Sequence, residues 1–344
     1  MSRCASLLLS LGLLLAGAAQ AAGLQTDATF TEPSPLAAGP ELARRTLSPL
    51  TALRLRQAIP DQIVDLRQER FTLYVPDPPP PQGYGLMVFV SPWPAAGLPA
   101  RWGQVLDRHG MIFVSAANAG NDAKPFERRE PLALLAARNV MARYPVDPAR
   151  IYITGFSGGS RVALRLALAY PDLFRGALLE AGSDPIGGDM PPPPAALFRR
   201  FQEASRLVYL TGAHDDFHMD MDRHSQQSMQ DWCVFDVATE TMPWSGHDLA
   251  SPAWFGRGLD ALARRNAADP DRLAECRARI DRDMDADLPQ VEALSAGDNR
   301  EAWRRLSAFD ARYGGLATDR TLALAQRLAA TQRRFRLPTG LKQA

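Results

Sequence analysis

The sequence predicts an α/β fold in which a mostly parallel sheet of roughly eight strands is covered by helices on both faces. Two observations carry this prediction. Between residues 66 and 265, short runs of β-branched and aromatic residues alternate with longer segments of helical apolar period. Several of these short runs are continuously apolar, as strands buried on both faces are. Such alternation is typical of βαβ units and therefore of a parallel sheet.

The individual elements follow in regular order along this region. The apolar runs predict strands at 70–76, 85–92, 111–117, 150–156, 175–182, 207–212 and 233–242. The periodic segments between them predict helices at 98–110, 130–145, 160–171, 195–206, 224–232 and 252–265. A proline-rich and glycine-rich stretch at 77–85 separates the first two strands and is expected to be a loop.

The N-terminus has the pattern of a secretory signal peptide. Arg3 precedes an apolar stretch from Ser6 to Ala19, and Ala19-Gln20-Ala21 is an A-x-A cleavage signal, so residues 1–21 are expected to be removed. The apolar stretch is short for a membrane span, although an uncleaved anchor is the alternative. We therefore expect a periplasmic or secreted protein with no membrane span after removal of the signal.

Composition divides the remainder into three parts. Residues 22–65 form an N-terminal extension rich in Pro, Ala and Thr, residues 66–265 form the α/β domain, and residues 266–344 form a charged helical region. Breaks are expected in this last region near Pro289, Gly297 and Gly314. It contains no catalytic pattern, so packing or docking is its expected role.

Charge and cysteine content limit the partners and the compartment. The 39 Lys and Arg residues nearly balance the 38 Asp and Glu residues, so no nucleic-acid partner is expected. Cys233 and Cys276 remain after signal removal. An oxidising compartment permits a disulfide between them, and two buried free thiols are the alternative. The sequence does not fix the oligomeric state.

One short motif indicates nucleophilic catalysis. Gly155-Phe156-Ser157-Gly158-Gly159 fits G-x-S-x-G and lies between an expected strand and an expected helix. In this nucleophile elbow, a serine occupies a strained turn that exposes its hydroxyl above the sheet. The Gly158 N–H, near the helix start, is expected to face a developing oxyanion. The alternative is that Ser157 only caps the helix.

A serine nucleophile needs a base and a carboxylate that orients it. His247 follows the last expected strand and precedes the last helix of the domain, where the base belongs in the chain order Ser, Asp or Glu, His. The carboxylate is expected after the penultimate strand, where Asp215 and Asp216 follow Gly212. Asp215 has the commoner spacing, and Asp216 stays as the alternative.

Further site residues come from the loop after the second expected strand and from nearby aromatic residues. Pro92 and Pro94 have no N–H, which leaves Ser91, Trp93 or Ala95 as the second oxyanion donor, and Trp93 is the one we expect. Its indole, Phe156 and Trp244 are expected to line the substrate pocket, although ordinary packing would also explain these aromatic residues.

The motif and its setting resemble those of the α/β-hydrolase superfamily. Residues 146–182, with the elbow and the later "YPDLF", resemble exported esterases related to polyhydroxybutyrate depolymerases and feruloyl esterases. The resemblance extends over about residues 70–265 and implies Ser157 as nucleophile, His247 as base and Asp215 or Asp216 as acid. Two departures concern the substrate. "SP" replaces the usual "HG" after the third strand of the fold, and the elbow reads S-G-G rather than S-A-G or S-M-G.

We therefore expect an exported serine hydrolase of small or polymeric carboxylic esters, with no cofactor and no metal. A serine peptidase of the same fold and a non-catalytic binding protein on this scaffold are the alternatives. A zinc or calcium site is a third, because residues 214–224 are rich in His and Asp. On a helix, His214 and His218 would share a face, as would Asp220 and His224.

Overall fold

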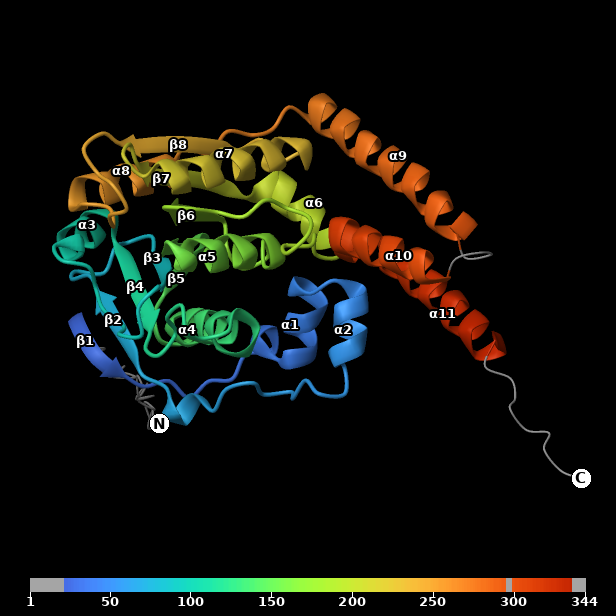
Figure 1. The fold of residues 1–344 in the computed structure, drawn as a ribbon. Helices are drawn as coiled ribbons and strands as arrows, with labels where there is room; N and C mark the ends of the chain where they lie inside the picture. The colour runs from blue at the N-terminus through green and yellow to red at the C-terminus, as the bar shows by residue number, and fades with distance from the viewer. Residues whose placement is uncertain (1–21, 295–298, 336–344) are drawn as a thin grey trace, which may run out of the picture.

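Apolar runs of β-branched and aromatic residues form the strands of one central sheet (Figure 1). The computed structural model describes residues 22–294 and 299–335. The eight strands lie in the order β1-β2-β4-β3-β5-β6-β7-β8. They are β1 (Gly23–Ala28), β2 (Phe71–Val75), β3 (Tyr84–Val90), β4 (Met111–Ala116), β5 (Val146–Phe156), β6 (Gly176–Glu180), β7 (Arg206–Gly212) and β8 (Val237–Met242).

Only β2 breaks the parallel arrangement, because it runs antiparallel to both β1 and β4. The other neighbouring strands pair in parallel. The predicted eight-stranded, mostly parallel sheet is confirmed. One placement differs: residues 66–265 supply seven strands, and the first strand lies in the N-terminal extension, at Gly23–Ala28. This edge strand is polar and largely exposed, so it lacks the apolar run that marks the others.

Helices cover both faces of the sheet (Figure 1). The helices are α1 (Gly39–Thr46), α2 (Pro49–Leu55), α3 (Trp102–His109), α4 (Glu130–Arg143), α5 (Gly158–Ala169), α6 (Ala195–Ala204), α7 (Asp216–Asp231), α8 (Pro252–Ala263), α9 (Pro270–Leu294), α10 (Asn299–Tyr313) and α11 (Thr318–Phe335). A π-helical turn at Pro125–Arg129 leads into α4. The expected order of strands and helices is therefore present.

Alternate residues of the buried strands point into two separate apolar cores, as the two-residue period of a strand requires. Leu86 and Val88 of β3 pack in the larger core with α4, α5 and α6, whereas Met87 and Phe89 pack with α3 and α8. In the smaller core, Trp102 of α3 stacks on Phe255 of α8, with ring centroids 3.6 Å apart. Apolar side chains therefore cover both faces of the sheet.

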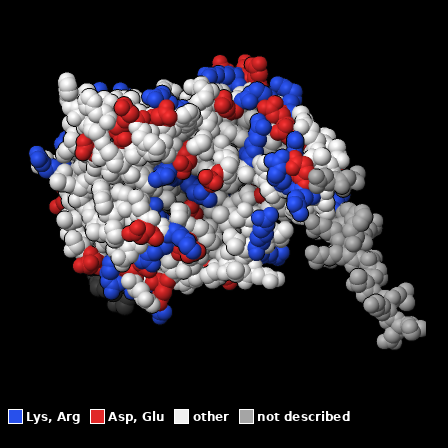
Figure 2. Space-filling view, in the orientation of Figure 1, with Lys and Arg blue, Asp and Glu red and all other residues white. Residues whose placement is uncertain are grey.

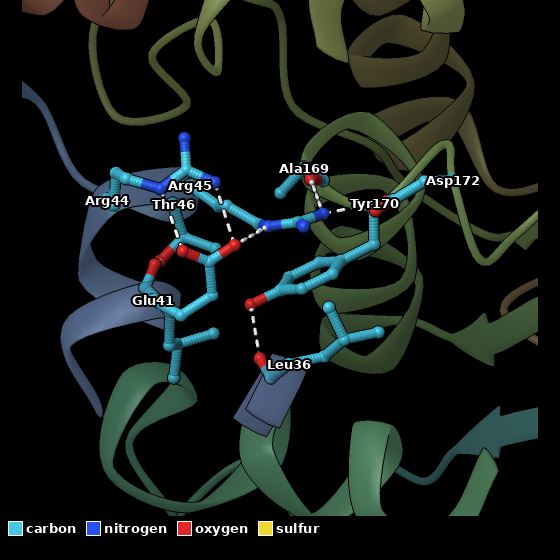
Figure 3. A network of polar contacts seen from close by, with 9 residues as sticks. Leu36, Glu41, Arg44, Arg45, Thr46, Ala169, Tyr170 and Asp172 are labelled. Atoms are coloured by element: carbon cyan, nitrogen blue, oxygen red, sulfur yellow. Dashed lines mark hydrogen bonds and ion pairs between the residues drawn. The ribbon is translucent and has the colours of Figure 1, made fainter. Parts of the chain in front are cut away.

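The N-terminal extension is fastened to the domain by a polar network between α1 and the end of α5 (Figure 3). Arg45 donates to Glu41 at 2.6 Å and to Asp172 at 2.7 Å, and also contacts the carbonyl of Ala169. The Tyr170 hydroxyl donates to the carbonyl of Leu36 at 2.8 Å. Because Arg45 is buried, these partners compensate its charge.

The C-terminal region consists of α9, α10 and α11, as expected, but one predicted break is wrong. The long helix α9 continues through Pro289, and Gly297 lies outside the described residues. At the third expected break, a 3₁₀ turn begins at Gly314. A Cβ on Gly315 would lie 2.4 Å from the nitrogen of Pro194, so this turn packs tightly on the proline-rich loop before α6.

A disulfide joins Cys233 to Cys276, with a Cα–Cα distance of 5.8 Å. It links the segment after α7 to α9, and it decides between the two alternatives that the sequence left open. The expected signal peptide, residues 1–21, lies outside the described residues. Within the described residues, no helix has both the length and the apolar character needed to span a membrane.

Candidate active site

Ser157 lies on a strained turn between β5 and α5. Its backbone has φ 55° and ψ −123°, outside the regions that a non-glycine residue usually adopts. Close approach of the backbone explains the glycines around it. A Cβ on Gly155 would lie 2.3 Å from the oxygen of Gly159, and a Cβ on Gly159 would lie 2.0 Å from the oxygen of Val90. The turn therefore has the geometry of a nucleophile elbow.

His247 lies in the loop between β8 and α8, and this loop is held at both sides. The Ala250 N–H donates to the carboxyl of Glu180 at 3.0 Å, and the Ala250 carbonyl accepts from the indole N–H of Trp102 at 2.9 Å. The Ser245 carbonyl accepts from the N–H of His214 at 2.9 Å. These bonds fix the histidine loop next to the ends of β6 and β7.

Ser157, His247 and Asp215 lie in one hydrogen-bonded series, although 90 residues separate the serine from the histidine. His247 Nε2 is 3.0 Å from Ser157 Oγ, and His247 Nδ1 is 2.6 Å from Asp215 Oδ2. Asp216, the alternative acid, is exposed in the first turn of α7. Of the two candidates, Asp215 is therefore the one whose carboxylate reaches the histidine.

Asp215 has a second histidine partner, which the sequence analysis did not assign to this role. His218 Nδ1 lies 2.8 Å from Oδ1 and 2.9 Å from Oδ2 of Asp215. Burial raises the pKa of Asp215, but the hydrogen bonds from His218 and His247 lower it by more than burial raises it. The pKa of Asp215 therefore lies below its usual value. The carboxylate is consequently ionised at neutral pH.

This arrangement defines the tautomer of the base. An ionised carboxylate only accepts hydrogen bonds, so the Nδ1 atoms of both histidines carry hydrogens that face Asp215. Neutral His247 then has an unprotonated Nε2, which accepts from the Ser157 hydroxyl. Such a base can remove the hydroxyl proton as the serine attacks an electrophile, and the carboxylate stabilises the resulting imidazolium.

The two expected oxyanion donors differ in their present bonding. Gly158 is the first residue of α5, so its N–H has no acceptor within the helix. The Trp93 N–H donates to the hydroxyl of Ser91 at 3.0 Å. A substrate oxyanion would therefore share or replace that bond at Trp93, whereas Gly158 can donate directly.

Aromatic rings form a continuous stack beside the base. Phe156 stacks on His247 with centroids 4.7 Å apart, and Trp93 stacks on Phe156 at 5.7 Å. Phe156 is buried, and the exposed half of Trp93 is free to contact a ligand. Trp244, the other expected pocket residue, is 89% exposed, and the structure does not bring it to this stack.

Of the two pairs that the metal alternative named in the His- and Asp-rich segment, the structure brings together Asp220 and His224 but directs His218 to Asp215 rather than to His214. His214 is exposed, whereas Asp215, His218 and His247 offer donor atoms that all lie within 4.8 Å of one another. His218 and His247 each already bond to Asp215 through Nδ1. Asp220 and His224 lie 3.6 Å apart on the exposed side of α7.

The strand order, the strained serine between β5 and α5 and the histidine after β8 define the α/β-hydrolase fold. No protein-family model matches the chain. A 44-residue stretch is 43% identical to poly(3-hydroxyalkanoate) depolymerase C of Paucimonas lemoignei and covers 13% of this chain. It spans only 11% of that depolymerase.

Solved structures similar to the chain include esterases and peptidases. A ferulic acid esterase is 17% identical, with a TM-score of 0.43, over 56% of this chain and 90% of its own. An acetyl xylan esterase from Aspergillus awamori is 12% identical, with a TM-score of 0.42, over 56% and 94%. An acylaminoacyl peptidase from Pyrococcus horikoshii is 15% identical, with a TM-score of 0.42, over 61% and 42%.

Proposed function

We propose that this chain is an exported serine hydrolase of carboxylic esters. The observation that carries the proposal is the hydrogen-bonded series from Ser157 Oγ through His247 to Asp215. The disulfide and the N-terminal signal pattern support export, because both suit an oxidising compartment.

In the proposed reaction, Ser157 Oγ attacks the ester carbonyl while His247 Nε2 takes the hydroxyl proton. The N–H groups of Gly158 and Trp93 stabilise the tetrahedral oxyanion, and each such donor typically contributes about 3 kcal/mol of barrier lowering. His247 then returns the proton to the leaving alcohol, which leaves an acyl group on Ser157. Water, activated by the same histidine, releases the acid and restores the hydroxyl.

A fluorophosphonate probe tests the nucleophile directly. We expect it to label the wild-type protein and not Ser157→Ala, which should retain the unfolding midpoint of the wild type. Hydrolysis of short p-nitrophenyl esters should fall by about 10⁴-fold or more in Ser157→Ala and stay unchanged in EDTA. Labelling that survives Ser157→Ala, or activity lost in EDTA, would contradict the assignment.

The same enzyme preparation separates esters from amides. Peptide amides and p-nitrophenyl esters would both be cleaved through an acyl group on Ser157, but they differ in the leaving group. An amine leaving group needs a proton from the general acid before it departs, whereas p-nitrophenolate does not. We expect the enzyme to hydrolyse the esters and to leave matched peptide p-nitroanilides uncleaved. Cleavage of the p-nitroanilides would favour the peptidase alternative.

A further inference from the structure

A cavity of about 300 Å³ opens beside the serine elbow and extends along α5. Gly158 lies at one end, and Arg161 and Arg165 follow at about one and two helical turns. Because Gly158 is also the proposed oxyanion donor, a ligand in this cavity would lie next to the reacting carbonyl. Figure 2 shows Lys and Arg side chains beside Asp and Glu side chains over α5, in the middle of the face drawn.

Arg129 lines this cavity as a buried cation that has no close ion pair among the described residues. It is only 4% exposed, and its guanidinium donates to the carbonyls of Ala119 at 2.9 Å and Ser91 at 3.0 Å. Among the described residues, no carboxylate lies within 4 Å of it. Burial lowers the pKa of Arg129 to about 10, and the charge of Arg161 acts in the same direction, whereas the charge of Glu130 acts in the opposite direction. A buried charge that is only partly compensated is costly, so an anion in the cavity would relieve this cost.

Arg161 differs from its neighbour Arg165. Arg165 Nε lies 3.1 Å from Glu130, and its other nitrogens donate to the carbonyls of Asp189 and Thr46. Arg161 is exposed on the cavity wall and forms no hydrogen bond or ion pair with the rest of the described chain. Its guanidinium is therefore available to a ligand.

The charges of the cavity define which anion it fits. Arg129, Arg161 and Arg165 outnumber Glu130 and Asp184, and burial raises the pKa of both carboxyl groups, so the cavity has a net positive charge. A carboxylate would offset this charge, and guanidinium groups match a carboxylate in planar, two-point geometry. The amide of Asn121, also on the wall, adds a further hydrogen-bond donor.

We infer that this cavity is a subsite for a carboxylate carried by the ester substrate. The inference rests on the proposed function and narrows its substrate class to acidic esters, such as half esters of short dicarboxylic acids or hydroxy-acid oligomers with a free acid end. A volume of about 300 Å³ lies at the small end of the range for ligand pockets, which suits a short acid rather than a long polymer segment.

Matched substrates test the subsite on either side of the ester bond. Mono-p-nitrophenyl glutarate and p-nitrophenyl valerate have acyl chains of equal length that end in a carboxylate or a methyl group. Phenyl butyrate and 3-carboxyphenyl butyrate place the same difference on the alcohol side. In at least one of these pairs, Arg161→Gln should lower kcat/KM for the acidic ester by about 10- to 100-fold. The kcat/KM for the neutral ester of that pair should change by less than about twofold.

Arg138→Gln is the matched control. Arg138 is an exposed residue of α4 that does not line the cavity, so its removal changes the net charge equally and should leave both substrate ratios unchanged. If the ratio of kcat/KM for the acidic ester to that for the neutral ester is the same in wild type and Arg161→Gln for both pairs, the inferred subsite is wrong. The proposed ester hydrolase would be unaffected by that result.

Binding of free glutarate tests the subsite without catalysis. Glutarate should raise the midpoint of thermal unfolding of wild type and Ser157→Ala. In Arg161→Gln, the glutarate concentration needed for the same shift should be at least tenfold higher. Equal protection by inorganic phosphate would show a general anion site and contradict a carboxylate subsite. Absence of protection by glutarate would overturn the inference even if every ester is hydrolysed.

Discussion

The imidazole of His218 lies parallel to that of His247, with ring centroids 4.0 Å apart and an angle of 13° between the ring planes. Both rings direct Nδ1 at the carboxylate of Asp215. Asp215 also caps α7, so its side chain is held between the helix start and two histidines. We regard His218 as a positioning residue, because its contacts reach Ser157 only through Asp215 and His247.

Two substitutions separate the hydrogen bond of His218 from its stacking. His218→Phe keeps a ring against His247 but removes the donor to Asp215, whereas His218→Asn retains an N–H near the Nδ1 position and loses the stack. We expect kcat/KM for a p-nitrophenyl ester to fall by about tenfold in His218→Phe and by much less in His218→Asn. Loss of one donor to a charged group, about 1.5–3 kcal/mol, sets the upper size of this effect.

The titration of Asp215 distinguishes this role from simple packing. His218 and His247 together lower the pKa of Asp215, so removal of the His218 donor should raise it. Carbon-13 NMR of the Asp215 carboxyl should show a higher midpoint in His218→Phe and a nearly wild-type midpoint in His218→Asn. Identical midpoints in all three proteins would show that His218 only fills space.

Glu180 gives the fold a specific pH dependence. It is fully buried between β5 and the histidine loop, and burial raises its pKa to about 8, although hydrogen bonds from Ala250 and Thr154 act in the opposite direction. Between the ordinary pKa of a glutamate and about 8, the folded state holds a proton that the unfolded state has lost. Stability should therefore fall as pH rises through this interval, by at most about 1.4 kcal/mol per pH unit from this group.

Glu180→Gln removes this titration and keeps an acceptor for the Ala250 N–H. We expect the free energy of unfolding of the variant to depend less on pH between 5 and 8 than that of the wild type, and to exceed it near pH 8. Urea unfolding at several pH values measures both curves. Parallel curves would mean that Glu180 is ionised in the folded protein.

The bridge between Cys233 and Cys276 closes a segment of 43 residues. A loop of that length restricts the unfolded chain by about 4 kcal/mol in the chain-entropy treatment. Cys276→Ser should lose stability of this order in urea unfolding. Dithiothreitol should destabilise the wild type similarly and have no further effect on the variant, and equal unfolding midpoints of wild type with and without reductant would contradict this.

Local signals in the sequence were sufficient to predict the elbow and most of the sheet. The apolar run of β5 and the glycines around Ser157 report structure within a few residues, and the position of His247 after β8 follows from strand order. β1 was missed because Gly23–Ala28 is a polar edge strand, with no apolar run to mark it.

Features that depend on tertiary contact were not visible in the sequence. His218 shared a helical face with His214 in the expected pattern, but the N-terminal turn of α7 directs His218 to Asp215 and leaves His214 exposed. Arg129 and Arg161 lie far apart in the chain, on different elements, and only folding brings them to one cavity. Trp244 shows the converse, since proximity in sequence to His247 did not place it in the aromatic stack.

The unusual S-G-G elbow has a cause in its surroundings. A Cβ on Gly158 would lie 2.2 Å from the side-chain oxygen of Asn121, so an alanine or methionine at this position would collide with this residue. Gly158→Ala should therefore displace Asn121 and cost about 1 kcal/mol of stability. In Asn121→Ala the space is vacant, and adding Gly158→Ala should then cost little, a non-additivity that urea unfolding of the two single variants and the double variant measures. Additive losses would mean that the strain arises from the backbone of the elbow itself rather than from the pair.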